Sequence, residues 1–379
     1  MKIWLFVCLV TTLAHTSQAV AASPAMGELT LDKQATLSEQ TMLDEQTILN
    51  EQTMLDEQTL AAALSNQKTR PFSGVAVIAQ GERILYSYAH GASTPIPLNS
   101  RFLIGSLSKQ ITAVLTLQQA QAAALRLNAS LADYGLSLSE PWLQQVRVGE
   151  LLNHTSGVTR PGAPLKFQPG DSFAYSNYGY EILGELIERV SGRSYRELAT
   201  KLFQGCGMTE SVVPEANNAI YPDGLAQGYS EDEQGGLAAA DIKGSFQRAP
   251  SSGVVSTAMD LVRWNQCLHD GVALAPEWYG RMTQASATRS HRWGELGYGY
   301  GVQVSRQGPR EYSHSGYVPG YISTLSYFPE RKISLVVLEN VSLSVRNMGR
   351  VFHHHDQVRS LLMRALQASP ATVATQERQ

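Results

Sequence analysis

Segments with a strand pattern lie near both ends of this 379-residue chain, and segments with a helical pattern lie between them. The first, 73–88, is typical of a hairpin that turns at Gln80-Gly81-Glu82. The later strand-like segments are 299–304, 321–327 and 333–338. The helical segments are 107–121, 180–190, 194–202, 257–268 and 351–366. Strands this far apart must share a sheet, so the sequence predicts an α+β fold: a mixed antiparallel sheet flanked by helices, with a mostly helical subdomain and a site in the cleft between them.

The composition is that of an ordinary globular protein. Hydrophobic residues make up 43% and charged residues 17% of the chain, so it does not have the composition of a disordered protein. The 30 basic and 33 acidic side chains leave a formal net charge of −3. This small charge gives no electrostatic reason to expect nucleic acid as a partner.

The N-terminus has the pattern of an export signal. Met1 and Lys2 precede a mostly apolar stretch, 3–14, and small residues follow at 19–22. This order is typical of a secretory signal peptide with an A-x-A cleavage site. The apolar stretch is too short for a transmembrane helix, which needs about 20 residues. We therefore expect residues 1–21 to be removed and the protein to be periplasmic or secreted, with no transmembrane span.

Residues 31–60 repeat with a period of six, and each unit begins with leucine. In an α-helix six residues advance by about 600°, so these leucines circle the axis instead of forming one face. In a strand they would share a face, but five units are too few for the core of a β-helix. We predict a weakly ordered arm or linker over 22–70, with a partner-binding or spacer segment as the alternative. The folded domain is expected over 71–366, beginning near Phe72, and a polar tail over 367–379.

Cys206 and Cys267 remain once the leader is removed. An oxidising compartment permits a disulfide, but two thiols in so long a chain do not form a disulfide framework. The paired spacing of zinc ligands is also missing. We expect two buried free thiols, with a bridge between them as the alternative.

Ser106 and Lys109 stand three residues apart where a helical segment begins. Residues at this spacing share a helix face, so the lysine Nζ can reach the serine hydroxyl. The N-terminus of the helix favours negative charge on that oxygen. A serine hydroxyl is a poor nucleophile until a base accepts its proton, and a lysine partly deprotonated by burial can do so. The pair predicts a nucleophile with its proton acceptor.

Two further motifs carry chemistry. A polar loop before the next helical segment presents Tyr175 and Asn177. A tyrosine beside a lysine can have its pKa lowered by the cation and then transfer protons, and the asparagine can hydrogen-bond a substrate carbonyl. The structural alternative is that this loop only begins a helix and that the tyrosine is packed in the interior.

Near the C-terminus, the end of a strand carries His314-Ser315-Gly316. The glycine allows a ligand backbone to approach closely. A backbone N–H at this strand edge can join that of Ser106 in an oxyanion hole.

Together and in this order, the motifs resemble those of the penicillin-recognising serine hydrolases. The branch is that of class C β-lactamases, D-aminopeptidases, low-molecular-weight DD-peptidases and β-lactamase-fold esterases. The resemblance covers about residues 71–366 and includes the connecting segments 146–157, 183–192 and 256–264. It implies a β-lactamase/transpeptidase-like fold and no metal or organic cofactor.

The resemblance also implies a role for each motif residue. Ser106 would be the acylated nucleophile, Lys109 and Tyr175 the proton relay, and the N–H groups of Ser106 and Tyr317 the oxyanion hole. The substrate would be bound by Asn177, His314, Ser315, Gly316 and Tyr317.

His314 departs from the family pattern, because class C β-lactamases carry lysine there. A fixed cation for a substrate carboxylate would be absent or pH-dependent, since histidine titrates near neutrality. We therefore expect an exported peptidase or esterase that acts on a small molecule or peptide, with cell-wall peptides and D-amino-acid derivatives as candidates. The alternatives are a class C-like β-lactamase and a non-catalytic protein that binds peptidoglycan or a partner. Specificity is expected in loops such as 230–250 and 285–297, and the oligomeric state is not predicted.

The run His353-His354-His355-Asp356 suggests a metal site. Consecutive helical residues point about 100° apart, so they do not converge on one ion. We favour a solvated or partly packed helix face and predict no metal site.

Overall fold

The computed structural model describes residues 55–65, 70–92, 94–215 and 221–368. The predicted leader and the repeat units before residue 55 lie outside the described residues, as do residues 369–379 of the predicted tail. Within the described ranges, no helix is both long enough and apolar enough to cross a membrane.

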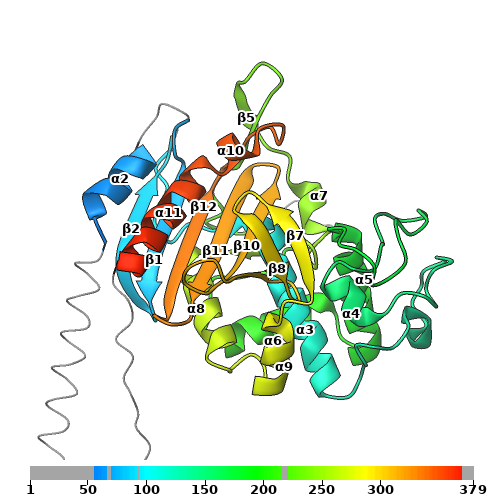
Figure 1. Ribbon diagram of the computed structural model, residues 1–379. Helices are drawn as coiled ribbons and strands as arrows, with labels where there is room; N and C mark the ends of the chain where they lie inside the picture. The colour runs from blue at the N-terminus through cyan, green and yellow to red at the C-terminus, as the bar shows by residue number, and fades with distance from the viewer. Residues whose placement is uncertain (1–54, 66–69, 93, 216–220, 369–379) are drawn as a thin grey trace, which may run out of the picture. The chain divides into compact units, whose positions relative to one another are not determined.

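An eight-stranded antiparallel sheet joins the two ends of the described chain (Figure 1). The hairpin of β1 (Gly74–Gln80) and β2 (Arg83–His90) forms one edge, and β1 also pairs with β12. The strand order is β2-β1-β12-β11-β10-β9-β8-β7. The other strands are β7 (Ala287–His291), β8 (Gly294–Tyr298), β9 (Gln303–Ser305), β10 (Glu311–Val318), β11 (Tyr321–Phe328) and β12 (Ile333–Glu339). Chain-distant strands share this sheet, as the sequence predicted.

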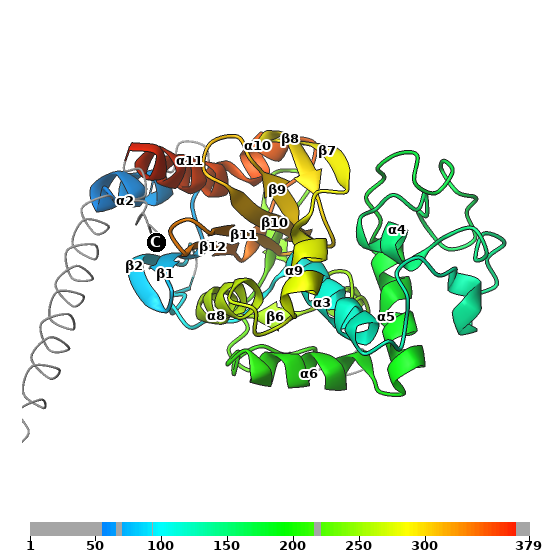
Figure 2. The same ribbon diagram turned by 60° about the horizontal axis from the view of Figure 1, so that its bottom comes forward.

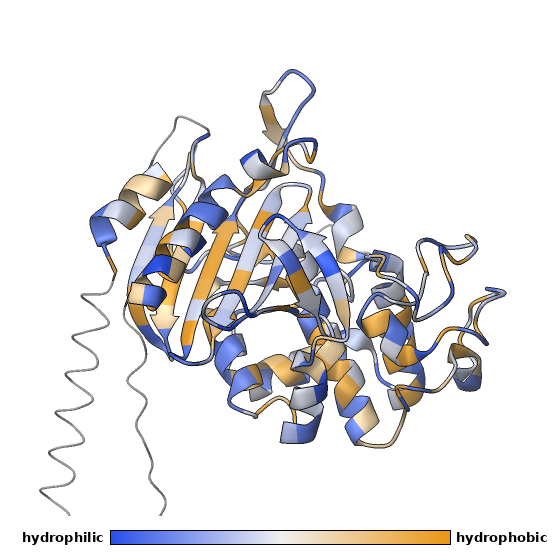
Figure 3. Ribbon diagram, in the orientation of Figure 1, coloured by the Kyte–Doolittle hydropathy of each residue, from blue (hydrophilic) through white to orange (hydrophobic). Residues whose placement is uncertain are grey.

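Helices cover both faces of the sheet. On β1, Val75 and Val77 pack in one hydrophobic cluster while Ala76 and Ile78 pack in another, because alternate residues of a strand point to opposite faces. Helix α8 (Ala258–His269) covers one face, and α2 (Glu57–Ser65) and α11 (His353–Ala368) cover the other (Figure 2). Figure 3 shows apolar residues along the central strands and on the inner helices.

The helical subdomain is formed by chain between β2 and β7. Its central helix, α3 (Ser108–Gln121), contacts α5, α6 and α9. The helices here are η1 (Gly105–Leu107), η2 (Leu131–Tyr134), α4 (Val148–Leu152), α5 (Asn177–Ser191), α6 (Tyr195–Gly205), α7 (Lys243–Phe246) and α9 (Pro276–Thr283); α10 (Met348–Val351) precedes α11. Short strands are β3 (Phe102–Leu103) with β6 (Val255–Ser256), and β13 (Val341–Ser342) with β4 (Tyr229–Glu231) and β5 (Leu237–Ala239). The predicted α+β class is confirmed.

The folded part begins earlier than the predicted start near Phe72. Leu60 and Leu64 of α2 are buried together with Leu55 in a cluster that includes α11 side chains. The last repeat unit therefore belongs to the folded part. Leu64 comes four residues after Leu60, the last residue of that unit, so both leucines lie on the same face of α2. Arg70 is also buried, and it pairs with a buried glutamate of β12.

Segment 285–297 is largely a hairpin of β7 and β8 instead of the predicted loop. The polar residues of β7 lie on both faces of the strand, so β7 gives no alternating hydrophobic pattern.

The strand predicted over 299–304 is shortened to β9, since Gly301 has a φ of +70°. A β-carbon on this glycine would lie 2.8 Å from the Lys109 carbonyl oxygen. Two short strands and α7 occupy much of 230–250.

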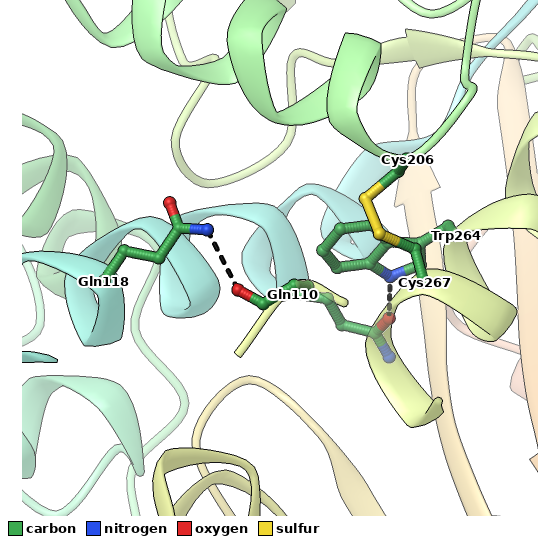
Figure 4. Close-up of a disulfide and its surroundings, with 6 residues drawn as sticks. Gln110, Gln118, Cys206, Trp264 and Cys267 are labelled. Carbon is green, nitrogen blue, oxygen red and sulfur yellow. Dashed lines mark hydrogen bonds between the residues drawn. A yellow bond between two sulfur atoms is a disulfide. The ribbon is translucent and has the colours of Figure 1, made fainter. Parts of the chain in front are cut away.

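Cys206 and Cys267 form a disulfide, so the expectation of free thiols is wrong (Figure 4). The bond joins the residue that ends α6 to α8, across 61 residues of sequence. Nearby, the indole N–H of Trp264 donates to Oε1 of Gln110 at 2.8 Å. The sequence does not show the bridge, because the distance between the thiols depends on how α6 packs near α8.

The histidine run at the start of α11 is more buried than expected. His354 and His355 are fully buried, and Nε2 of His355 lies 3.1 Å from the Glu339 carboxylate. Arg70 donates to the same carboxylate at 2.6 Å. Burial alone would raise the pKa of Glu339, but the charge of Arg70 and the hydrogen bonds around the carboxylate hold it well below its usual value. Among the described residues, no group of three side chains is arranged to hold a metal ion.

Candidate active site

Ser106 lies in η1, a single 3₁₀ turn that leads directly into α3. Gly105 precedes it with a φ of +55°, which favours glycine. The hydroxyl of Ser108 donates to the Gly105 carbonyl, and that of Ser323 on β11 donates to the Ile104 carbonyl, both at 2.7 Å. These bonds fix the turn against the sheet and hold Ser106 beside the cavity described below.

Lys109 is fully buried one turn later, and its Nζ lies 3.2 Å from Oγ of Ser106. The amine also donates to Oδ1 of Asn177 and to the carbonyl oxygen of Ser251, both at 2.7 Å. The i, i+3 spacing therefore brings the predicted pair together. Asn177 contacts this pair as well as lining the cavity.

The protonation state of Lys109 follows from its surroundings. Burial lowers its pKa well below the usual value, and the carboxylate of Glu181 opposes this shift without reversing it. An uncharged amine has two N–H donors and one lone pair. Nζ lies within hydrogen-bonding distance of three oxygens, those of Ser106, Asn177 and Ser251; in the uncharged form that burial favours, Asn177 and Ser251 would accept the two N–H groups and the lone pair would face the Ser106 hydroxyl.

Tyr175 lies in the loop before α5, and its phenol is near enough to Ser106 for the serine hydroxyl to lower the pKa of the phenol. The Nζ of Lys109 is 4.8 Å from the centre of the tyrosine ring. A hydroxyl, an amine and a phenol that are distant in sequence therefore meet at one place.

The pKa of Tyr175 differs from the expectation that Lys109 lowers it. The residue keeps 37% of its surface exposed, yet burial around the phenol raises the pKa to about 12. The Ser106 hydroxyl and the charge of Arg289 act in the opposite direction. The expectation is wrong because Lys109 is itself buried with a lowered pKa, so it is not a fixed cation. The phenol keeps its proton at neutral pH.

Strand β10 passes η1 so closely that only glycine fits at the contact. A β-carbon on Gly316 would lie 2.3 Å from the Ile104 carbonyl oxygen and 3.0 Å from the backbone nitrogen of Ser106. A β-carbon on Gly105 would lie 3.0 Å from the backbone nitrogen of Tyr317. The two predicted oxyanion donors, on Ser106 and Tyr317, are thereby brought to one side of the cavity.

His314 is buried and neutral, so the expected titration near pH 7 is wrong. Burial, with the nearby charge of Arg289, lowers its pKa to about 3. Its Nδ1 donates to the Ser315 carbonyl oxygen, and its Nε2 accepts from the Tyr298 hydroxyl, both at 2.9 Å. Both ring nitrogens are therefore occupied, and this histidine offers no positive charge to a ligand.

Arg289 of β7 supplies a cation that the sequence did not reveal, since its segment has no recognisable pattern. Its guanidinium lies 5.4 Å from the ring centre of Tyr175 and 5.7 Å from that of Phe173. Its Nε is buried without a hydrogen-bond partner, and no carboxylate among the described residues lies within ion-pair distance. The neighbouring Arg292, by contrast, pairs with Asp356 at 2.8 Å.

A cavity of about 570 Å³ opens between the helical subdomain and the sheet, where the sequence predicted a cleft. Its lining includes Ser106, Tyr175, Asn177, Arg289, His314, Ser315, Gly316 and Tyr317. Strand β9 pairs with β10 only over Glu311–Ser313, so β10 has no strand partner on this side beyond Ser313 in the described chain. An extended backbone can pair with this free edge.

Comparisons with known proteins identify the family of the chain. The Beta-lactamase family model matches residues 57–357. Penicillin-binding protein 4* of Bacillus subtilis (strain 168) is 27% identical over 71% of this chain and 68% of its own length. A D-aminopeptidase of Brucella anthropi is 23% identical over 71% and 56%, respectively. The crystal structure of a penicillin binding protein from Bacillus halodurans shares 25% identity with a TM-score of 0.67, and the match covers 80% of this chain and 99% of that one. The resemblance found in the sequence is confirmed.

Proposed function

Because the chain belongs to the Beta-lactamase family, we propose that it is an exported serine hydrolase that cleaves an amide or ester bond through an acyl-enzyme on Ser106. One observation carries the proposal. The amine of Lys109 is fully buried, which favours its uncharged form, and it lies 3.2 Å from the hydroxyl of Ser106, whose proton it can then accept. This arrangement supplies an activated nucleophile at the edge of a cavity.

The proposed reaction assigns each group one step. Lys109 accepts the proton of Ser106 as Oγ attacks the substrate carbonyl carbon, and the N–H groups of Ser106 and Tyr317 stabilise the resulting oxyanion. Tyr175, protonated because its pKa is about 12, donates its proton to the leaving nitrogen or oxygen, and regains one from Lys109. Water then attacks the acyl carbon and gives a proton to Lys109, which returns it to Oγ of Ser106 as the bond between the acyl carbon and Oγ breaks and the product acid leaves.

Two features of the cavity favour a peptide with a free carboxylate as substrate. Arg289 offers a positive charge that no described carboxylate neutralises, and a substrate carboxylate would satisfy it. The free edge of β10 can pair with an extended peptide backbone. We therefore rank a peptidase above an esterase, and the predicted export makes cell-wall peptides accessible to the enzyme.

A class C-like β-lactamase is the second candidate function. The same unpaired Arg289 can hold the carboxylate of a β-lactam, although it comes from β7 and not from the third motif. A non-catalytic binding protein is less well supported, because Ser106, Lys109 and Tyr175 are all present and in contact.

Labelling tests the enzyme proposal directly. The protein is incubated with a fluorophosphonate or a fluorescent penicillin, and the intact mass is measured. We expect one adduct per chain, and no adduct with Ser106→Ala. A wild type without any adduct, or an adduct that survives the substitution, contradicts the proposal.

A substrate panel separates the activities. It compares an acyl-D-Ala-D-Ala peptide, its C-terminal amide, a D-amino-acid amide, a p-nitrophenyl ester and a cephalosporin. We expect the free peptide acid to have the highest kcat/KM, and a higher value for the cephalosporin would favour the β-lactamase. Export is tested by expressing the full chain and sequencing the N-terminus of the mature protein, which is expected near residue 22.

A further inference from the structure

His154 has a backbone φ of +63°, a left-handed conformation that residues other than glycine rarely adopt. It is fully buried in the turn after α4. Strained backbone of this kind persists where the surrounding structure holds it, and it concentrates at functional sites. The chemistry proposed above uses no atom of His154, so its conformation needs a separate explanation.

His154 holds the backbone on both sides of Tyr175. Its carbonyl oxygen accepts the N–H of Ala174 at 2.9 Å, and its Nδ1 accepts the N–H of Ser176 at 3.2 Å. One residue therefore anchors the peptide groups immediately before and after the tyrosine.

These two hydrogen bonds are the last of a series that joins the turn at 154–157 to the loop at 166–176. The N–H of Lys166 donates to the Gly157 carbonyl, and the N–H of Gly170 donates to the Thr155 carbonyl, both at 2.8 Å. The segment that carries Tyr175 is neither helix nor strand, so it depends on such contacts for its position. His154 provides the contacts that lie at the tyrosine itself.

The imidazole also packs directly against the tyrosine ring. The ring centres of His154 and Tyr175 are 4.3 Å apart. Phe173, Tyr180 and Tyr298 surround the same imidazole, with ring centres 5.1 to 5.6 Å away. A ring enclosed in this way has little freedom to turn, and it fixes the plane on which Tyr175 rests.

The hydrogen bond from Ser176 requires an unprotonated Nδ1, so the neutral ring carries its hydrogen on Nε2. Burial lowers the pKa of His154 well below its usual value, and the positive charge of Arg289 acts in the same direction. The imidazole thus stays neutral and keeps its bond to the backbone at working pH.

We propose that His154 is a positioning residue that holds the Tyr175 phenol beside the Ser106 hydroxyl. It touches no substrate, since it is fully buried, and it acts only through the tyrosine. The inference rests on the proposed function, because the phenol matters most if it donates a proton during catalysis.

Two variants separate its contributions. His154→Asn keeps an acceptor near the position of Nδ1, and asparagine tolerates the left-handed conformation. His154→Gly fits the same conformation but removes both the acceptor and the ring. Ser156→Ala is the matched control in the same turn, because Ser156 is buried and bonds to Val158 instead of to the tyrosine segment.

The readout is the single-turnover rate of acylation by an acyl-D-Ala-D-Ala peptide, whose leaving nitrogen must be protonated, with Tm measured in parallel. We expect His154→Gly to lower the acylation rate about 100-fold with KM nearly unchanged, since misplacing a catalytic group by about 1 Å has an effect of this size. His154→Asn should recover at least part of that loss. Ser156→Ala should lower Tm while leaving the rate unchanged. A wild-type rate in His154→Gly, or a rate in the control that falls in step with Tm, overturns the proposal.

A double-mutant cycle tests whether His154 acts through the tyrosine. In a Tyr175→Phe background, which already lacks the phenol, His154→Gly should cause little further loss of rate. Equal fold losses in both backgrounds would mean that His154 stabilises the fold generally, and would overturn the proposal.

The failure of this inference is distinguishable from that of the proposed function. If the wild type forms no adduct, the proposed function fails, and a crystal structure of His154→Gly then decides the positioning claim without any turnover. The claim expects the Tyr175 hydroxyl to lie farther from the Ser106 hydroxyl than it does in the wild type. An unchanged tyrosine would overturn it.

Discussion

The Nζ of Lys109 lies 3.2 Å from Oγ of Ser106, and two oxygens accept its N–H groups on the other sides. The amine is fully buried, so its charged form is disfavoured. Burial favours the uncharged amine of Lys109. With its N–H groups directed to Asn177 and Ser251, this amine can accept the proton of Ser106.

The first prediction concerns the pH dependence of acylation. Deprotonated Lys109 is the active form, so the rate should rise with pH through the pKa of the amine and then level off. Because burial lowers that pKa well below 10.5, the plateau should be reached well below pH 10.5. Lys109→Met should lower the rate by about 10²- to 10⁴-fold. Single-turnover acylation measured between about pH 5 and pH 9.5 checks this, and an equally fast Lys109→Arg enzyme would contradict it.

Arg289 is predicted to select anionic substrates. Arg289→Gln should lower kcat/KM for a peptide with a free C-terminal carboxylate by about 10- to 100-fold, because a charged hydrogen bond of about 1.5–3 kcal/mol is lost. The matching C-terminal amide should be affected little, and Arg289→Lys should retain part of the preference. Steady-state kinetics on the acid and amide pair give the answer. Equal losses on both would show that Arg289 acts structurally, through its contact with Tyr175.

The disulfide is predicted to stabilise the fold without taking part in catalysis. Replacing Cys206 and Cys267 together by serine should lower the free energy of unfolding by about 2–4 kcal/mol, since the bridge closes a loop across 61 residues. The thiol-free protein should keep its acylation rate, because neither cysteine lines the cavity of Ser106. Denaturant unfolding with and without a reductant measures the effect. A reductant that leaves the Tm of the wild type unchanged would argue against the bridge.

Arg70 should matter more for stability than an exposed arginine. Arg70→Ala leaves the buried Glu339 carboxylate without its charged partner, so a loss of about 3–5 kcal/mol is expected. Arg281→Ala is the control, because its pair with Glu277 is exposed and should contribute about 0.5 kcal/mol. A double change of Arg70 and Glu339 to leucine should cost less than Arg70→Ala alone. Similar losses for both single variants would contradict the role given to burial.

The fold was predictable from the sequence where periodicity is strong. The pattern of Leu107, Ile111, Val114 and Leu115 indicates α3, and all four side chains are buried. β7 was missed because it has polar residues on both faces, and β8 because only Leu296 and Tyr298 mark its buried face, which is too short a pattern to recognise. The start of the fold was placed too late, because Leu64, which completes the buried face of α2, lies just after the repeat.

The site was predictable where the chemistry lies within a short motif. Ser106 and Lys109 are in contact because their spacing fixes it. Arg289 and His154 were not assigned roles, since both act through neighbours that are distant in sequence. The charge of His314 and the pKa of Tyr175 were misjudged for the same reason: burial dominates both, and it depends on the packing of the whole domain.

Helix α2 packs with α11 in a cluster that includes Leu85 and Tyr86 of β2, at the sheet edge opposite β7. The Ser106 cavity is bordered by β7 and β10. An affinity tag, a fusion partner or a surface linkage introduced directly ahead of α2 would therefore be attached on the β2 side of the sheet, at the edge opposite β7.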